Sequence, residues 1–130
     1  MKGTPTKKVA GTIAECKVVQ QLLEEGFGVS WALGENVAWD LIADWNGKVS
    51  RLQVKSTSVL SSRGNYRIIL THLQQRRRRY NSRDADAIVA VCPPGFYVIP
   101  IKKLKHVTLT FNTDGTGYYS ASKDDWGALK

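Results

Sequence analysis

An Asn-Gly pair at positions 46 and 47 constrains the fold of this chain more than any other local feature. It stands between two runs typical of strands, Ala38 to Trp45 and Lys48 to Thr57. A type I′ turn requires a positive φ at both central residues, and Asn-Gly is a preferred pair for that conformation. The pattern therefore predicts a β-hairpin with a two-residue loop.

The predicted loop determines which residues of the two strands face each other. Counting outward from it pairs Leu41 with Leu52, and Asp40 with Gln53. Because side chains alternate along a strand, Lys55 shares the face of Asp40 and Gln53. Directly opposed Cβ atoms lie about 4.5–5.5 Å apart, so an acid, an amide and an amine are expected to converge on one patch. The opposite face is expected to enter the core with Trp39, Leu41, Leu52 and Val54.

This patch suits metal-assisted hydrolysis of a phosphodiester. Mg²⁺ takes oxygen ligands, which the Asp40 carboxylate and the Gln53 amide can supply. Such an ion polarises a phosphoryl oxygen and acidifies a bound water, while Lys55 can contact the phosphate or orient the water. The same residues also fit a solvated ion pair across a hairpin, so the pattern by itself leaves both interpretations open.

A helix is predicted from Val9 to Glu25. Thr6 is a suitable N-cap, and Gly26 is a suitable stop. Apolar residues recur at helical spacing between these ends. They are Val9, Ala10, Ile13, Ala14, Val19, Leu22 and Leu23.

Glu15 holds a distinctive place on this predicted helix. On a helical wheel it lies beside Val19 and Leu22, on the shoulder of the apolar face. A glutamate in a helix is more often solvated, and Glu24 and Glu25 are interpreted in that way. The inward position favours a functional role for Glu15.

Further strands are predicted on both sides of the hairpin. One run, 29–33, precedes it, and four runs follow it: 66–71, 86–91, 96–101 and 107–111. One helical turn is expected at 124–129. The stretch 72–83 is interpreted as a loop or a helix. A length of 130 residues with 42% hydrophobic residues fits a single domain, with residues 1–8 as a flexible basic arm.

The charge of the chain indicates a polyanionic partner. The formal net charge is +8, and a surplus of this kind favours nucleic acid over a membrane surface. A solvated charge run is the alternative interpretation of the arginine-rich segment. The residues expected to contact DNA are Gln75, Arg76, Arg77, Arg78, Arg79 and Arg83, with Lys7, Lys8, Arg63 and Arg67 as weaker candidates.

Cys16 and Cys92 are the only cysteines of the sequence. The absence of a CxxC pair or a Cys/His cluster argues against a structural zinc site. Two separated thiols, both expected to be buried, fit a reducing cytoplasm better than a disulfide framework. No run approaches the roughly 20 apolar residues of a membrane span, so a soluble cytoplasmic protein is expected.

Three segments, taken in order, resemble the PD-(D/E)XK nuclease superfamily. They are GTIAECKVVQQLLEEGFGVS, WDLIADWNGKVSRLQVKST and DADAIVAVCPPGFYVIPI. The superfamily pattern is a helical glutamate, an aspartate at the start of a hairpin, and an acid-x-lysine on the returning strand. Glu15, Asp40 and Gln53-Val54-Lys55 match it, over a region of about residues 9–101. The segments are similar to a branch that contains a small intron-encoded homing endonuclease, in which glutamine also replaces the second acid.

The resemblance implies a fold and a set of roles. The implied fold is α/β (α+β) and restriction-endonuclease-like, with a mixed central sheet, an N-terminal helix and a hairpin that carries the active site. Glu15 and Asp40 are implied to face the metal, Gln53 takes the place of the second acid, and Lys55 is the catalytic lysine. Mg²⁺ is the expected cofactor, with Mn²⁺ as a substitute. Because Gln53 is neutral, the site is less suited to a second metal ion.

The expected function is a metal-dependent DNA endonuclease of the homing or restriction type. A Holliday-junction resolvase and a catalytically inactive DNA-binding domain are the two alternatives. Since one site cuts one strand, a homodimer or homotetramer is expected for cleavage of both strands of a duplex.

Overall fold

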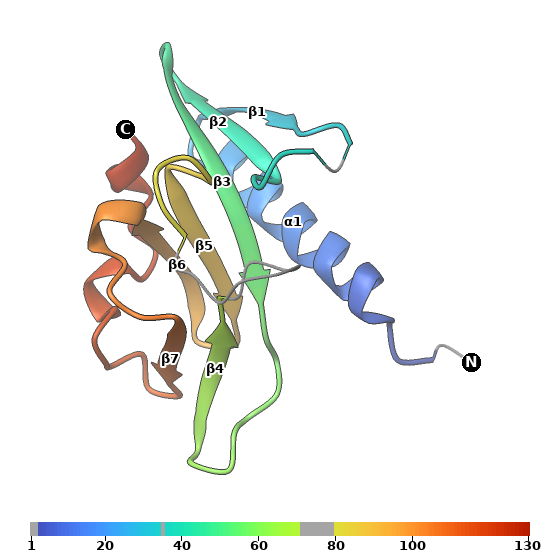
Figure 1. Cartoon of the computed structure of the whole chain (residues 1–130), viewed down its shortest axis with the longest axis vertical. Helices are drawn as coiled ribbons and strands as arrows, with labels where there is room; N and C mark the ends of the chain where they lie inside the picture. The colour runs from blue at the N-terminus through green and yellow to red at the C-terminus, as the bar shows by residue number, and fades with distance from the viewer. Residues whose placement is uncertain (1–2, 35, 71–79) are drawn as a thin grey trace.

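The computed structural model describes residues 3–34, 36–70 and 80–130. Its elements follow one another along the chain as one long helix, seven strands and three short 3₁₀ turns within those ranges (Figure 1). They are α1 (Lys7–Glu24), β1 (Gly28–Trp31), β2 (Leu41–Trp45), β3 (Lys48–Ser56), β4 (Asn65–Ile69), β5 (Ala87–Cys92), β6 (Gly95–Pro100), η1 (Ile101–Lys103), β7 (Thr108–Asn112), η2 (Ser120–Ser122) and η3 (Trp126–Leu129).

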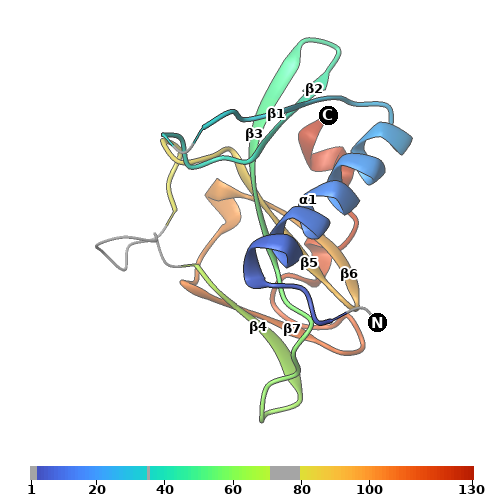
Figure 2. The same ribbon diagram turned by 90° about the vertical axis from the view of Figure 1, so that its right-hand side faces the viewer.

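The central sheet is mixed, in the order β1-β2-β3-β5-β6. β3 and β5 run parallel, and the other neighbours are antiparallel. Helix α1 lies across one face, and the two-stranded sheet β4-β7 lies toward the other (Figures 1 and 2). This arrangement confirms the expected restriction-endonuclease-like α+β fold. No helix within the described residues is long and apolar enough to span a membrane.

Each face of the central sheet carries its own hydrophobic core. The core under α1 contains Ala14, Val18 and Leu22 from the helix, together with strand residues and the terminal turn η3. The second core lies between β5–β6 and the inner face of β4-β7. Strand β5 contributes to both cores because its side chains alternate, with Ala87 and Val89 in the first and Ile88 and Ala90 in the second. This explains why the β5 run is apolar throughout.

The hairpin forms as predicted. Asn46 and Gly47 have φ angles of 50° and 94°, and Leu41 pairs with Leu52 in the expected register. The Asp44 carboxylate also accepts a hydrogen bond of 2.7 Å from the Gly47 amide. The turn residues therefore determine the register of both strands, as the sequence predicts.

Trp39 departs from the expected arrangement. The sequence places it in the core opposite Val54, but β2 begins only at Leu41. The indole of Trp39 instead lies beside the guanidinium of Arg51, whose Cζ is 5.0 Å from the ring centroid. Arg51 and Leu52 are neighbours on one strand and face opposite sides, so Trp39 lies on the side away from Leu41 and Leu52.

The N-terminal helix is two residues longer at its start than predicted. Thr6 caps it through its side-chain oxygen, which accepts a hydrogen bond from the Val9 amide at 3.2 Å, and Gly26 follows its end with a φ of 95°. Lys7 and Lys8 thus belong to α1 rather than to a basic arm.

The face that α1 buries also differs from the predicted one. Its buried residues are Ala14, Val18 and Leu22, whereas Val9 and Ile13 remain 49% and 42% exposed. The apolar stripe read from the sequence was too broad, because the sheet covers only one side of the helix.

The short elements and the cysteines give mixed outcomes. The strands β1 and β4 to β7 lie within one or two residues of the predicted runs, and η3 confirms the terminal turn. Cys92 is buried as expected, but Cys16 is exposed on α1. Most of the stretch predicted as loop or helix, at positions 71–79, lies outside the described residues.

Candidate active site

The central feature of the site is a fork in the sheet. Strand β2 begins only at Leu41, opposite Leu52, while β3 continues past Leu52 to Ser56 and stays paired with β5 through Ser56 and Val91. Beyond Leu52, the edge of β3 that faced β2 would expose its amides. The carboxylate of Asp40 fills this position, because Oδ2 accepts a hydrogen bond of 2.8 Å from the Val54 amide.

Asp40 is held at the fork by its own backbone as well. Its amide donates to the Leu52 carbonyl at 2.8 Å, and its carbonyl accepts from the Ala32 amide at 3.0 Å. These two backbone bonds hold Asp40 between β3 and the segment after β1, one residue before β2 begins. The second carboxylate oxygen, Oδ1, has no hydrogen-bond partner among the described residues and is available to a ligand.

Glu15 approaches Asp40 from α1. Burial, followed by the negative charge of Asp40, raises the pKa of Glu15, and a side-chain hydrogen bond from Trp31 opposes the rise. The pKa of Asp40 is raised by burial too, against the lowering effects of the Val54 amide and of Lys55. Two neighbouring, partly buried carboxylates with raised pKa values form a site that favours a cation.

Lys55 and Gln53 complete the patch from β3. Burial lowers the pKa of Lys55, while the charge of Asp40 opposes this shift. The Lys55 ammonium lies 5.9 Å from the centroid of the Tyr80 ring. Gln53 is half-buried on the same side of the strand, and its Nε2 makes a long contact of 3.5 Å with the Val54 carbonyl. The fork thus brings Glu15, Asp40 and Lys55 together, with Gln53 beside Lys55.

The donor set fits a hard divalent cation. Two carboxylates and one amide oxygen are the ligand types that Mg²⁺ and Mn²⁺ bind. Across the described parts of the chain there is no group of three or more His, Cys, Asp or Glu side chains suited to a metal. The site would therefore leave several coordination positions to water or to substrate oxygens, as Mg²⁺ sites commonly do.

Comparison with known proteins bears on this geometry. The family description PD-(D/E)XK endonuclease matches residues 5–115. This chain belongs to the PD-(D/E)XK endonuclease family. The function expected from the sequence, a metal-dependent DNA endonuclease, is thereby confirmed, and nucleases of this family generally use divalent metal ions.

Two solved structures are similar to this PD-(D/E)XK endonuclease. A bacterial homing endonuclease, I-Ssp6803I, has 27% sequence identity and a TM-score of 0.82, covering 96% of this chain and 93% of that one. Hjc, a Holliday junction resolvase from Archaeoglobus fulgidus, has 13% identity and a TM-score of 0.53, covering 80% and 84%. The second likeness concerns the fold alone. The chain has no significant match among curated proteins.

Two aromatic residues, Trp31 and Tyr80, flank the candidate site, although the sequence did not place either of them there. Trp31, on the edge strand β1, lies near Glu15, where its side chain opposes the rise in the pKa of that carboxyl. Tyr80 lies against Lys55, although its place after the arginine run indicated no such contact. Neither position follows from a local pattern, because both contacts join segments far apart in the sequence.

Arg51 ties the active-site hairpin to the segment that precedes β5. Its Nη2 contacts Asp86 Oδ1 at 3.0 Å, and its Nε donates to Asp86 Oδ2 at 3.1 Å. Two further hydrogen bonds reach the carbonyls of Ser82, at 2.6 Å, and Arg83, at 3.2 Å. Trp39, the residue before Asp40, packs on the same guanidinium. Arg51 therefore links Asp86 to the backbone next to Asp40.

The predicted DNA contacts are only partly placed. Arg83 is exposed in the turn after Tyr80, where its amide donates to the Asn81 side chain at 2.9 Å. Gln75 and the four arginines at 76–79 lie outside the described residues, so their role stays a prediction.

We expect Arg51→Met to lower the free energy of unfolding by about 1–2 kcal/mol, since it removes charged hydrogen bonds that are partly screened by solvent. Asp86→Asn should show a loss that depends on pH. Arg51 holds the pKa of Asp86 below its usual 3.8, so the ion pair stabilises the fold above about pH 4 and ceases to do so as the pH falls through the lowered pKa.

Urea unfolding of both variants near pH 7 and pH 3 measures these effects. Asp124→Asn is the matched control, because Asp124 makes a 3.5 Å ion pair with Lys123 while more than half exposed; its expected change is within about 0.5 kcal/mol. An Asp86→Asn loss that is unchanged at pH 3 would contradict the assigned ion pair.

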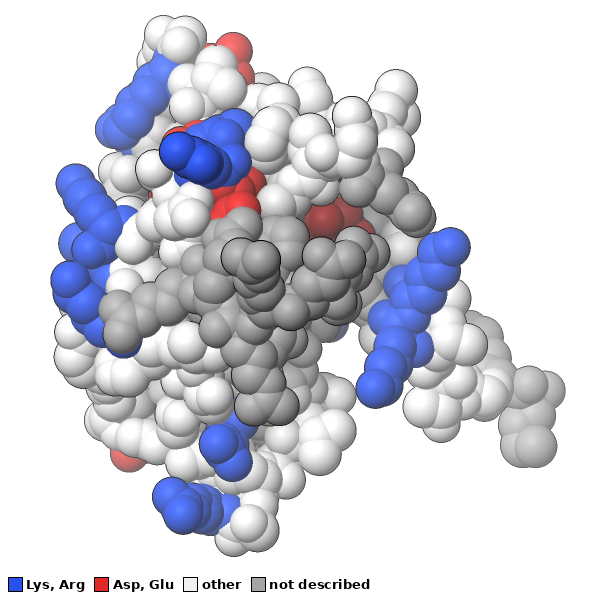
Figure 3. All heavy atoms as spheres, viewed as in Figure 1, with Lys and Arg blue, Asp and Glu red and all other residues white. Residues whose placement is uncertain are grey.

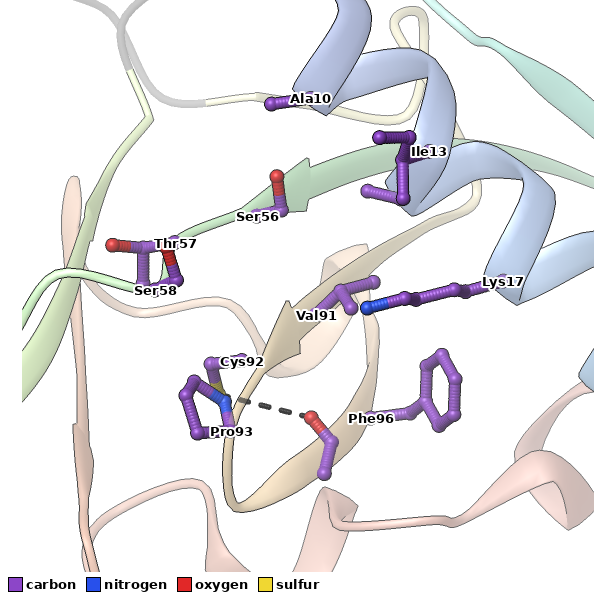
Figure 4. A pocket seen from close by; sticks show the side chains of 12 residues that line it. Ala10, Ile13, Lys17, Ser56, Thr57, Ser58, Val91, Cys92, Pro93 and Phe96 are labelled. Carbon is purple, nitrogen blue, oxygen red and sulfur yellow. Dashed lines mark hydrogen bonds between the residues drawn. The ribbon is translucent and has the colours of Figure 1, made fainter. Parts of the chain in front are cut away.

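A separate pocket of about 490 Å³ lies between α1 and the ends of β3 and β5 (Figure 4). Lys17 points into it beside Val91 and Phe96. Its polar rim consists mainly of Ser56, Thr57 and Ser58 at the end of β3. Among the residues that the structure describes, no carboxylate lines it, so this pocket adds no metal ligands to the candidate site.

Proposed function

We propose that this endonuclease hydrolyses phosphodiester bonds of double-stranded DNA with Mg²⁺ held by Glu15, Asp40 and the Gln53 amide oxygen. The observation that carries the proposal is the fork, where Asp40 is held through Val54 and interacts electrostatically with both Glu15 and Lys55. Mn²⁺ has the same oxygen preference and is the expected substitute.

The two carboxylates explain why a cation would bind here. Burial raises both pKa values, and the charge of Asp40 raises that of Glu15 further; a divalent ion relieves both penalties. Asp40 can present Oδ1 while Oδ2 remains bonded to the Val54 amide. The ion, when bound, polarises a phosphoryl oxygen and lowers the pKa of a coordinated water.

Lys55 acts on the phosphate side of the reaction. Its ammonium lies near Asp40 and is confined by the Tyr80 ring. In that position it can donate to a non-bridging phosphate oxygen and stabilise the charge that grows as water attacks phosphorus and the P–O bond breaks. Partial burial strengthens this interaction, because solvent screens the charge less.

Linear duplex is the favoured substrate over a four-way junction. The structure with 27% identity is a homing endonuclease, whereas the resolvase shares only the fold at 13% identity. An inactive DNA-binding domain is disfavoured because Glu15, Asp40 and Lys55 still converge. Cleavage of both strands requires two sites, which supports a homodimer or homotetramer. Two unpaired thiols support a reducing, cytoplasmic location.

The deciding experiment is incubation with a plasmid library in Mg²⁺, in Mn²⁺ and in EDTA, followed by sequencing of the ends. We expect cleavage with either ion and none with EDTA. Lys55→Ala should reduce the rate by about 10²–10³-fold, the usual effect of removing one electrostatic stabiliser. Lys17→Ala, on the opposite side of α1, is the matched control and should retain the wild-type rate.

Two outcomes would contradict the proposal. One is the absence of cleavage at every Mg²⁺ and Mn²⁺ concentration, and the other is full activity of Lys55→Ala. A competition between labelled linear duplex and a four-way junction separates the two substrate classes, and preferential cutting of the junction would favour the resolvase alternative.

A further inference from the structure

The two-stranded sheet β4-β7 has one buried and one open face. Its inner side chains lie in the second core: Tyr66, Ile68, Leu109 and Phe111. The register places three pairs on the outer face, namely Asn65 with Asn112, Arg67 with Thr110, and Ile69 with Thr108. The centre of this face is open, because Arg67 and Thr110 are exposed and Ile69 is 60% exposed.

The polar groups of this outer face differ in whether they are already engaged. At its end, Asn65 Oδ1 accepts from the Ser61 hydroxyl at 2.6 Å, and Asn112 Nδ2 donates to Thr116 at 3.2 Å. In the middle, the side chains of Arg67 and Thr110 make no hydrogen bond or ion pair with any residue in the described ranges. The free groups are therefore a guanidinium and a hydroxyl, side by side on neighbouring strands.

Two arginines lie at this sheet, and one acid follows it. Arg63 stands in the exposed connection before β4, and Arg67 lies on β4 itself. The acid that follows β7, Asp114, is occupied by the amide and hydroxyl of Thr116 at 3.0 and 2.6 Å. In the space-filling view, Lys and Arg side chains lie at the lower end, where β4 lies, and also along the left edge and at the upper centre of this face, while acidic side chains show in its upper half and at the lower left (Figure 3).

The position of the sheet relates it to the cleavage site. Strand β3 ends at Ser56, one residue beyond Lys55, and the chain then enters the connection to β4. A bridge between Leu60 and Tyr66 folds that connection back along the strand. Figures 1 and 2 both show β4, β7 and the connecting loop projecting from the end of the molecule where β3 terminates.

We propose that the outer face of β4-β7 reads base sequence in the major groove of the DNA substrate. The proposal rests on DNA being the substrate and adds the element that selects its sequence. The major groove admits a two-stranded β-ribbon. An arginine fork can bond the O6 and N7 atoms of guanine, and a threonine offers both a hydroxyl for base edges and a methyl for the thymine methyl group.

Within this arrangement the residues have different parts. Arg67 and Thr110 make the base contacts, and Ile69 with Thr108 offers an apolar contact to thymine methyl groups. Arg63, at the exposed loop, contacts phosphate and adds affinity without sequence information.

The test is a selection of bound duplexes from a random-sequence library, with Ca²⁺ in place of Mg²⁺. Wild type is compared with Arg67→Lys, which keeps the charge but loses the planar guanidinium, and with Thr110→Val, which keeps the shape but loses the hydroxyl. Both changes are at exposed positions and should leave the fold intact. The control is Lys103→Arg on η1, a similar change away from the ribbon.

The wild type should enrich a defined sequence. Arg67→Lys should reduce discrimination for guanine at one position by roughly tenfold, because it weakens binding of the wild-type sequence while affinity for duplexes without that guanine stays within about twofold. Thr110→Val should relax an adjacent position, and Lys103→Arg should recover the wild-type sequence. The inference is overturned if both ribbon variants recover the wild-type sequence with equal discrimination, or if the wild type enriches none.

Failure of the inference is distinguishable from failure of the proposed function. A wild type that selects a sequence through Arg67 but never cuts with Mg²⁺ or Mn²⁺ contradicts cleavage and supports the ribbon. A wild type that cuts, with ribbon variants of unchanged specificity, contradicts only the ribbon.

Discussion

Asp40→Asn should abolish DNA cleavage, by a factor of at least about a thousand, while leaving the fold at least as stable as the wild type. The amide removes a negative charge from the proposed metal site, where Glu15 is the only other described acid in contact with it electrostatically. An asparagine oxygen can still accept the hydrogen bond from the Val54 amide. The backbone geometry around residue 40 should therefore persist, although DNA cleavage is lost.

The stability of this variant has a definite sign. Burial raises the pKa of Asp40 above its usual 3.8, so the folded state holds the ionised carboxylate less favourably than the unfolded state does. Near pH 7 the substitution should stabilise the metal-free protein by up to about 1 kcal/mol. The difference should shrink as the pH falls through the raised pKa and vanish below the usual 3.8, because Asp40 is then protonated in both states.

Thermal unfolding with and without Mg²⁺ measures both the stability of this variant and how much the ion stabilises each protein. The wild type should gain roughly 2–3 kcal/mol at an ion concentration near a hundred times its dissociation constant, and Asp40→Asn should gain little. Asp44→Asn is the matched control, since it makes the same change at the exposed end of β2. Retained cleavage by Asp40→Asn, or an equal Mg²⁺ effect in both proteins, would overturn the assignment.

Leu52→Ala should cause the largest loss of stability, about 3 kcal/mol, with a fall of roughly 10 °C in the melting temperature. Leu52 is fully buried in the core under α1, and its strand neighbours Leu41 and Ala87 are fully buried too. Truncation removes buried methyl groups and leaves a cavity that strands on both sides keep from collapsing.

Urea and thermal unfolding check this value against Val49→Ala on the same strand. Val49 is 55% exposed, so its truncation should change stability by no more than about 0.5 kcal/mol. Leu52→Ala should still cut DNA at temperatures where it is folded, because the Leu52 carbonyl that accepts from the Asp40 amide belongs to the backbone. A loss below 1 kcal/mol would mean that the surrounding strands close over the cavity.

For helix α1, a periodic sequence pattern predicts the presence of the helix but not its buried face. Its existence and its cap at Thr6 follow from local chemistry, because a threonine oxygen satisfies an amide of the first turn. Its buried face does not, since Val9 and Ile13 are apolar yet exposed while Val18 is buried. Which stripe is covered depends on where the helix crosses the sheet.

Trp39 illustrates the same limit in a strand. Alternation continued through it would place the indole in the core, and tertiary structure places it on Arg51 instead. The regular ladder ends because the Asp40 carboxylate takes the place of a strand neighbour at the Val54 amide. A side chain that substitutes for backbone leaves no periodic signal.

The sequence by itself determined the hairpin, its register and the shared face of Gln53 and Lys55, because positive φ at Asn46 and Gly47 and the alternation of side chains are local properties. Tertiary structure alone decided that β2 begins only at Leu41, that Glu15 reaches Asp40, and that Trp31 and Tyr80 flank them. Those contacts join α1, β1, β3 and the segment before β5. They depend on how separate elements pack around two cores, which no local spacing of residues specifies.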